Sequence, residues 1–338
     1  MSGVLVEALR SRMQRPAFAP LAALASLWLL MLCLDPGYFA MSIENGRLFG
    51  GAIDILNRAA PVALLAIGMS LVIATGGIDL SVGAVMAIAG AVSANLIASG
   101  EYSIAEAVLA GLAAGALAGA INGSLVAWLG IQPIVATLIL MVAGRGVAQL
   151  INGGQIITFQ NEAFAWIGTG QFIGLPVPVW IVVLVAALTI LIFRRTALGL
   201  FLESTGANET ASRYVGLPVR RLKLLAYAAL GICAAMAGLV ATADIQGADA
   251  NNVGLWIELD AILAVVIGGA SLTGGRFSIS LSVVGALIIQ SINTAIVLSG
   301  IPPDYNLVIK ALVIIAVLLA QSPEFRGQLA AILPGARS

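Results

Sequence analysis

Residues 194–223 read RRTALGLFLESTGANETASRYVGLPVRRLK, a polar and basic segment in the second half of a chain that otherwise consists mainly of apolar stretches. The segment contains six Lys or Arg residues but only two acidic ones, Glu203 and Glu209. Such an excess of positive charge between two membrane spans is typical of a cytoplasmic loop. Because the segment is too long for a simple turn, it predicts a structured element on the cytoplasmic side.

The centre of this segment, residues 206–217, predicts a short helix between Gly206 and Gly216. At helical spacing, its small and apolar residues can form one packing face, made of Ala207, Ala211, Tyr214 and Val215. We interpret this helix as a docking element for a cytoplasmic partner. The alternative interpretation is a solvated loop with no partner.

The composition places the whole chain in a membrane. Of its 338 residues, 60% are hydrophobic and only 9% are charged, and the mean hydropathy is +1.06. With about 20 apolar residues for each crossing, the chain has room for about ten helices and for no soluble catalytic domain. The predicted fold class is therefore all-α, a polytopic membrane protein of about ten transmembrane helices.

The apolar stretches give the positions of these helices. They form one membrane domain, 17–321, between a cytoplasmic N-terminal segment, 1–16, and a cytoplasmic tail, 322–338. The predicted spans are 17–34, 56–74, 78–98, 103–129, 131–151, 176–193, 224–243, 255–270, 277–299 and 305–321.

The Lys and Arg residues support this orientation, since twelve of the sixteen fall on the side predicted to be cytoplasmic. Three exceptions bear on the argument below. Arg58 lies near the outer face, Arg145 lies within a span and needs an internal partner, and Lys310 can extend its amine to the outer surface.

Glycines predict where helices break or pack closely. Broken helices are expected near 75–83 and 267–277, where freed backbone groups must face protein or water. Residues at these breaks are candidates to line or gate a solute path: Gly76, Gly77, Asp79, Ser81, Ser271 and Thr273. Asp79 can also simply cap the following helix. A second feature is the run Gly111, Gly115, Gly119 and Gly123, which predicts close helix packing, either within one subunit or between two.

Three amides lie within apolar spans: Asn122, Gln290 and Asn293. Each costs free energy unless it is bonded, so we expect them either to hydrogen-bond between helices or to line the path.

The residue types that are missing exclude several kinds of chemistry. The chain has no histidine and only two cysteines, both within predicted spans, and it contains no nucleotide-binding GxxxxGK[ST] sequence. We therefore predict no catalytic residues, no metal site and no cofactor. A partner subunit must handle any ATP. A rival hypothesis is an ion-coupled secondary transporter that uses Asp79, Glu258 and Asp260.

Several longer stretches carry a family resemblance. The chain resembles the permease subunits of carbohydrate ABC importers of the ribose and xylose type in 61–92 (PVALLAIGMSLVIATGGIDLSVGAVMAIAGAV), 131–150 (IQPIVATLILMVAGRGVAQL), 196–219 (TALGLFLESTGANETASRYVGLPV) and 259–278 (LDAILAVVIGGASLTGGRFS). The resemblance covers about residues 45–320. Within the family, the sequences of 47–69 (RLFGGAIDILNRAAPVALLAIGM) and 244–262 (DIQGADANNVGLWIELDAI) look most like those of galactofuranose permeases.

The resemblance implies a sugar importer of the bacterial inner membrane. A periplasmic sugar-binding protein would dock outside, two permease subunits would form the path, and ATP-binding subunits would bind in the cytoplasm. The second permease would be a related chain, giving a heterodimer, although a homodimer is common among such proteins. The family's ATPase-contacting helix corresponds to Gly206, Asn208, Glu209, Ala211 and Gly216.

Overall fold

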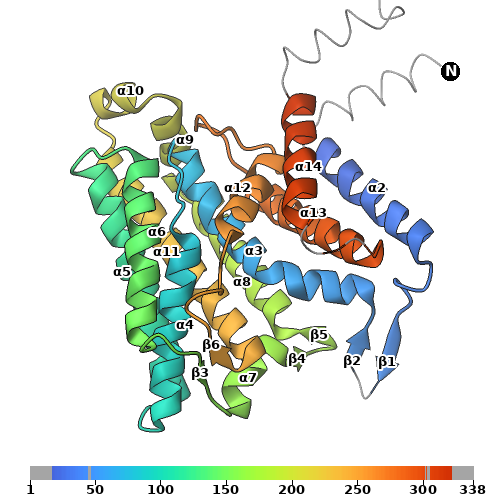
Figure 1. Cartoon of the computed structure of the whole chain (residues 1–338). Helices are drawn as coiled ribbons and strands as arrows, with labels where there is room; N and C mark the ends of the chain where they lie inside the picture. The colour runs from blue at the N-terminus through green and yellow to red at the C-terminus, as the bar shows by residue number, and fades with distance from the viewer. Residues whose placement is uncertain (1–16, 45–46, 301, 303–304, 322–338) are drawn as a thin grey trace, which may run out of the picture.

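The computed structural model describes residues 17–44, 47–300, 302 and 305–321 of the chain. The predicted cytoplasmic segments 1–16 and 322–338 lie outside these residues. Figure 1 shows an assembly of helices with only short strands, as the predicted all-α class requires.

Each predicted span contains a helix. In chain order these helices are α2 (Phe18–Leu34), α3 (Gly51–Ala74), α4 (Val82–Ser99), α5 (Ile104–Ala127), α6 (Pro133–Ile151), α8 (Val177–Arg195), α11 (Val219–Ile245), α12 (Ile257–Ile267), α13 (Ile279–Leu298) and α14 (Asn306–Gln321). Seven of them are long and apolar enough to cross a membrane, whereas α2, α12 and α14 are shorter. The all-α membrane architecture is confirmed, with seven helices of full spanning length in the described part of the chain.

Shorter elements connect the spans. Between α8 and α11 the chain forms α9 (Leu198–Ala207) and α10 (Glu209–Tyr214), and α7 (Glu162–Thr169) precedes α8. Three antiparallel two-stranded pairs join β1 (Ser42–Glu44) to β2 (Arg47–Phe49), β3 (Ile157–Thr158) to β6 (Gly247–Ala248), and β4 (Gln171–Phe172) to β5 (Leu175–Pro176). Helices α9 and α10 lie at one end of the molecule, and α7, β4 and β5 lie toward the opposite end (Figure 1).

Local sequence explains several helix ends. Helix α5 begins with a capping box, in which the Ser103 hydroxyl accepts from the Glu106 amide and the Glu106 carboxylate accepts from the Ser103 amide. Proline stands at or next to the first position of α6 and α8, where its missing N–H removes no helical hydrogen bond.

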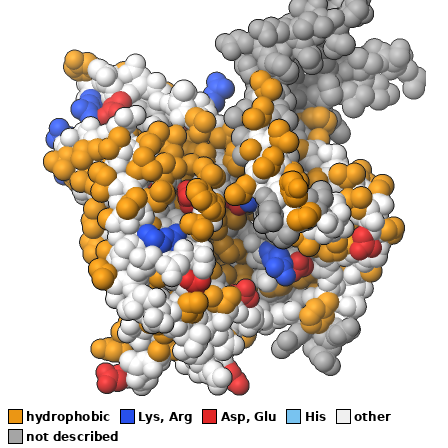
Figure 2. Space-filling model, in the orientation of Figure 1, with side chains coloured by type: hydrophobic (Ala, Val, Ile, Leu, Met, Phe, Trp, Pro, Cys, Tyr) orange, Lys and Arg blue, Asp and Glu red, His pale blue; other side chains and the backbone are white. Residues whose placement is uncertain are grey.

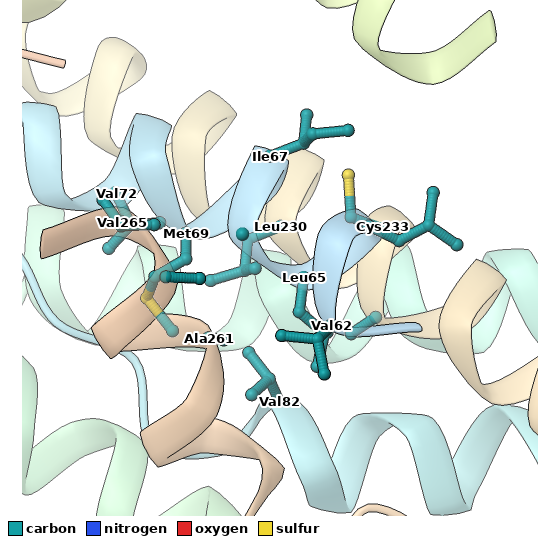
Figure 3. Close-up of a cluster of buried hydrophobic side chains, with 14 of the residues drawn as sticks. Val62, Leu65, Ile67, Met69, Val72, Val82, Leu230, Cys233, Ala261 and Val265 are labelled. Carbon is teal, nitrogen blue, oxygen red and sulfur yellow. The ribbon is translucent and has the colours of Figure 1, made fainter. Parts of the chain in front are cut away.

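Helix α3 forms the centre of the core. It contacts α11, α13, α12 and α8, and Leu64, Leu65 and Ile67 along it are fully buried. Figure 3 shows the packing of α3 side chains against Val82, Leu230 and Val265, which come from α4, α11 and α12. The rest of the chain therefore covers most of α3, of whose span 78% is buried.

The peripheral helices are different, because little of their apolar surface is covered. Within an apolar stretch of 18 residues in each helix, only 28%, 22% and 17% of α5, α6 and α8 are buried, against 78% for α3. Apolar side chains cover much of the face shown in Figure 2, as expected for a surface in contact with lipid or a partner subunit.

The glycine run of α5 packs within the chain. A side chain at Gly115 or Gly119 would meet the backbone of α11, and one at Gly123 would lie 3.0 Å from the Leu224 Cα. A side chain at Gly111 would meet Ser93 and Ala89 of α4. The structure thus favours the first of the two interpretations, close packing inside one subunit.

Candidate functional site

The polar segment between α8 and α11 folds into two helices, α9 and α10, joined at Asn208. Asn208 is the N-cap of α10, and its side-chain oxygen accepts a hydrogen bond of 2.9 Å from the Ala211 amide. The buried Ser212 hydroxyl donates to the Ser204 carbonyl of α9 at 2.8 Å. These contacts hold α10 firmly against α9, and Gly216, with a φ of +84°, ends the element.

Glu209 ties α10 to the start of α11. Its carboxylate bridges Arg213, at 2.5 Å, and Lys223, at 2.6 Å. Partial burial raises the pKa of Glu209, but the hydrogen bonds and positive charges of Lys223 and Arg213 outweigh burial and hold that pKa below its usual value. Glu209 is therefore an internal tether as well as a surface charge.

The predicted packing face of this region is turned away from the rest of the chain. Ala207 and Ala211 are exposed, and the side chains of Tyr214 and Val215 are 88% and 76% exposed. None of the four packs into the core, so the expected face exists but has no partner within the described residues.

Gly206 lies where α9 meets both glycine-rich breaks. A side chain at Gly206 would collide with the Ala74 carbonyl at the end of α3 and would lie 2.6 Å from the Gly275 nitrogen. The Gly275 amide donates to the Ala74 carbonyl at 3.0 Å, which joins the two breaks to each other. Gly76 and Gly274 have φ values of +77° and +90°, a conformation that favours glycine.

The break after α3 leads into a buried polar cluster. The Asp79 carboxylate accepts from the Ser81 amide at 2.7 Å and from the Ser81 hydroxyl at 2.6 Å. Asn122 of α5 donates to the Ser81 hydroxyl at 2.8 Å and to Asp79 at 3.3 Å. All three residues are at most 2% exposed. The N-cap of α4 is Ser81 rather than Asp79, so Asp79 supports the turn before the helix and joins it to α5.

Gly77 borders this cluster through Tyr227 of α11. A side chain at Gly77 would lie 2.6 Å from the Tyr227 hydroxyl, which is buried and has no hydrogen-bond partner among the described residues. Any residue larger than glycine at this position would therefore displace either the break or Tyr227.

The other predicted path residues have separate surroundings. At the second break, the hydroxyls of Ser271 and Thr273 bond to each other at 2.7 Å within the turn. Gln290 and Asn293 lie on α13, where Gln290 lines a cavity and the buried oxygen of Asn293 has no partner among the described residues. The structure thus does not bring all nine predicted path residues to one place.

The cavity that contains Gln290 lies at the end of the molecule opposite α10. Its volume is about 400 Å³, and its polar lining residues are Asp54, Asn57, Arg58, Asp244 and Gln290. They come from the start of α3, the end of α11 and the middle of α13. The sequence singles out two of these five residues. Gln290 is a candidate path residue there, whereas Arg58 is notable only for its positive charge near the outer face. The remaining three acquire a shared environment only when distant helix ends meet.

Two charged residues within the membrane region have internal partners. The Arg145 guanidinium donates to the carbonyls of Ala250 and Val253, at 3.0 and 2.6 Å. Lys310 does not extend to the outer surface as predicted, because its amine pairs with Asp260 at 2.7 Å and both side chains are only 13% exposed.

Comparison with known proteins identifies the family. Residues 51–318 match the family model described as "Branched-chain amino acid transport system / permease component". No solved structure matches the chain.

Individual relatives are similar over most of their length. The galactofuranose transporter permease protein YtfT of Escherichia coli K12 is 56% identical, with 94% of this chain and 93% of that protein covered. The fructose import permease protein FruF of Bifidobacterium longum is 39% identical, covering 89% and 86%, and the ribose import permease protein RbsC of Escherichia coli K12 is 37% identical, covering 90% and 93%. The chain belongs to this family of transport-system permease components.

Proposed function

We propose that this chain is the transmembrane permease subunit of an ATP-driven sugar importer, with galactofuranose or a related monosaccharide as its cargo. The named cargo of YtfT, at 56% identity, supports this sugar class, and FruF and RbsC are also named as sugar permeases. The chain itself has no enzymatic role in this proposal, and a partner subunit hydrolyses ATP.

We assign a different soluble partner to each end of the molecule. An ATP-binding subunit docks on α10 in the cytoplasm, a periplasmic sugar-binding protein docks at the opposite end, and a second permease completes the path, as a heterodimer or alternatively as a homodimer. Both termini face the cytoplasm of a bacterium whose inner membrane the chain crosses several times. The Lys and Arg distribution supports this orientation.

The exposed face of α10 is the observation that carries the proposal. Tyr214 and Val215 are presented to solvent on a helix that Asn208, Ser212 and Glu209 hold rigidly. A large exposed aromatic side chain on a helix held in this way is typical of an anchor in a protein interface. The exposed Tyr214 therefore supports a role in coupling to the ATPase for the residues in and around α10, which are Gly206, Asn208, Glu209, Ala211 and Gly216.

Alternating access is the mechanism that we propose. ATP binding moves the partner subunits, α10 and α9 follow, and the breaks near 75–83 and 267–277 change the exposure of the central path. A ligand shifts such an equilibrium only if it binds one state better than the other. In this scheme Gly76 and Gly77 act at the gate, while Asp79, Ser81 and Asn122 fix the position of the break after α3.

Two of the three acidic residues considered for an ion-coupled carrier have internal partners, and the third, Glu258, is buried in α12. Asp260 is paired with Lys310, and the Asp79 carboxylate accepts hydrogen bonds from Ser81 and Asn122. Neither carboxylate lines the cavity that contains Gln290.

Reconstitution in proteoliposomes tests the proposal. Sugar uptake should require ATP and the partner ATPase and should persist without an ion gradient. Tyr214→Ser should reduce co-purification of the ATPase and sugar uptake together, whereas Tyr102→Ser, at the opposite end and 49% exposed, should leave ATPase binding unchanged. Uptake driven by an ion gradient alone would overturn the assignment.

A further inference from the structure

The cavity opposite α10 has the size and lining of a small-molecule site. Its volume of about 400 Å³ lies within the range of about 300–1,000 Å³ that is usual for such sites, near the lower end. Apolar residues such as Pro61, Val240 and Val253 complete the wall around the five polar ones. A monosaccharide, which has both hydroxyl groups and apolar C–H faces, suits a wall of this mixed kind.

The polar groups offer hydrogen bonds from several directions. The amides of Asn57 and Gln290 can both donate and accept, the carboxylates of Asp54 and Asp244 accept, and the Arg58 guanidinium donates. Each sugar hydroxyl can also donate and accept, so the lining matches a polyhydroxylated ligand without needing any charge on it.

Some of these groups lack a partner in the described part of the chain. The Asn57 side-chain oxygen is buried and accepts no hydrogen bond there, and the amide of Gln290 reaches only Thr294, at a long 3.4 Å. A buried acceptor without a partner is costly, and a rotation of the Asn57 amide that turns this oxygen toward the cavity would let a ligand hydroxyl relieve that cost. Asn57, after such a rotation, and Gln290 are the groups best placed to gain bonds when the cavity fills.

The charged side chains of the lining give the cavity wall a net negative charge. Arg58 binds Asp54 through its Nε at 2.8 and 2.9 Å, and Asp244 lies on the same cavity with its own negative charge. Two carboxylates and one guanidinium leave one net negative charge on the wall. Repulsion of like charges disfavours an anionic ligand, which is a means of selecting against a competing cargo.

We propose that this cavity is a binding site for a neutral monosaccharide within the permease and that it excludes anionic sugars such as sugar phosphates. The proposal rests on the function proposed above, and it assigns part of the selectivity to the permease itself. Asn57 and Gln290 hydrogen-bond the sugar, and Asp244 supplies the unneutralised charge that rejects anions.

Protection of a single cysteine tests binding directly. Ala241 lines the cavity without contributing a polar side chain, so Ala241→Cys in a Cys33→Ser, Cys233→Ser background reports on occupancy. With the full-length permease and its partner subunits in the absence of ATP, galactose should slow the reaction of this cysteine with a small neutral thiol reagent. Galactose 6-phosphate at the same concentration should not. A cysteine at the exposed Gln155, outside the cavity, should react equally fast in all cases.

The lining variants test the individual roles. Asn57→Leu and Gln290→Leu should each weaken protection by galactose about tenfold, the effect of losing about 1.4 kcal/mol of hydrogen bonding. Thr189→Val is the matched control, because the Thr189 hydroxyl bonds only to its own helix, at Val185, and is not part of the cavity. Asp244→Lys reverses the sign of the wall and should let galactose 6-phosphate protect Ala241→Cys.

Two results would overturn the inference: no protection by galactose, or equal protection by both sugars before Asp244 is changed. The labelling experiment needs no ATP. If wild-type uptake depends on ATP while protection is absent, only the cavity assignment fails; if protection occurs while uptake does not depend on ATP, the importer assignment fails instead.

Discussion

Replacing Gly206 by alanine adds one methyl group at the point where α9 meets the two glycine-rich breaks. The new Cβ would collide with the Ala74 carbonyl and would lie 2.6 Å from the Gly275 nitrogen. Ordinary contacts of a Cβ begin at about 3.4 Å, so α9 and the 271–276 turn must separate by at least about 0.8 Å. Because the obstacles are backbone atoms, no side-chain rotation can relieve the clash.

The expected magnitude follows from this geometry. Adding a methylene-sized group to a well-packed contact costs about 1–3 kcal/mol. If that cost is borne by one of the two states of the transport cycle, it changes their ratio by about 5- to 150-fold. We therefore expect ATP hydrolysis to continue while the number of sugar molecules imported for each ATP falls by about tenfold or more.

The assay measures uptake and ATP hydrolysis together in proteoliposomes that contain the partner subunits. Gly146→Ala is the matched control, because a methyl group at Gly146 meets nothing within 4 Å and the residue lies in the middle of α6. Abundance in the membrane and ATPase co-purification separate uncoupling from misfolding. A Gly206→Ala permease that keeps the wild-type ratio of sugar to ATP would refute the role assigned to this contact.

Three further predictions concern charged residues and orientation. Asp260→Asn leaves the buried Lys310 amine unpaired and should destabilise the protein by about 3–5 kcal/mol in thermal denaturation, with Lys310→Met in addition restoring most of the loss. The lowered pKa of Glu209 means that its tether to α11 stabilises α10 above the unfolded pKa of about 4.3 and that this stabilisation disappears as the pH falls through the lower folded pKa; ATPase association should follow that decline in the wild type but should not vary with pH in Glu209→Gln. Cysteines at the exposed positions Thr210 and Gln155, in a background without Cys33 and Cys233, should react with an impermeant thiol reagent from opposite sides of the membrane, and labelling of both from one side would contradict the orientation.

The sequence predicts the membrane helices well because each crossing needs its own run of apolar residues. Lengths are harder to predict, as α12 illustrates. The expected span 255–270 is only a helix of eleven residues, Ile257–Ile267, since Trp256 takes a left-handed backbone conformation before it and the Gly268–Gly269 turn follows it. Neither effect changes the hydropathy of the segment.

The exposed helix α10 shows a second limit. Its residues predict a helix with one small and apolar face, and this face is present at Ala211, Tyr214 and Val215. Periodicity cannot distinguish an apolar face that packs inside the chain from one that awaits a partner. Only the fold reveals that this one is exposed.

The sequence does not predict the cavity residues as a site, and the reason is a different one. Asp54, Asn57 and Arg58 have the spacing of one helix face, yet that spacing also suits an ordinary solvated first turn. They become a candidate site only because the end of α11 brings Asp244 beside them and α13 adds Gln290. These meetings depend on tertiary packing across more than a hundred residues of sequence, which local patterns do not encode.

Helix α3 joins the two regions that sequence reasoning leaves separate. Its last residue, Ala74, accepts the hydrogen bond that links the breaks beside Gly206, and its first turns carry Asp54, Asn57 and Arg58 into the cavity. The junction at Gly206 consists of backbone against backbone, so a displacement of α9 must move the end of α3 rather than a flexible side chain. Pro61 lies within α3 and lines the cavity, and it interrupts the backbone hydrogen bonds of the helix. A helix bends most readily at such a proline. We therefore expect a movement at α10 to reach the cavity through α3 and to alter it at the Pro61 turn.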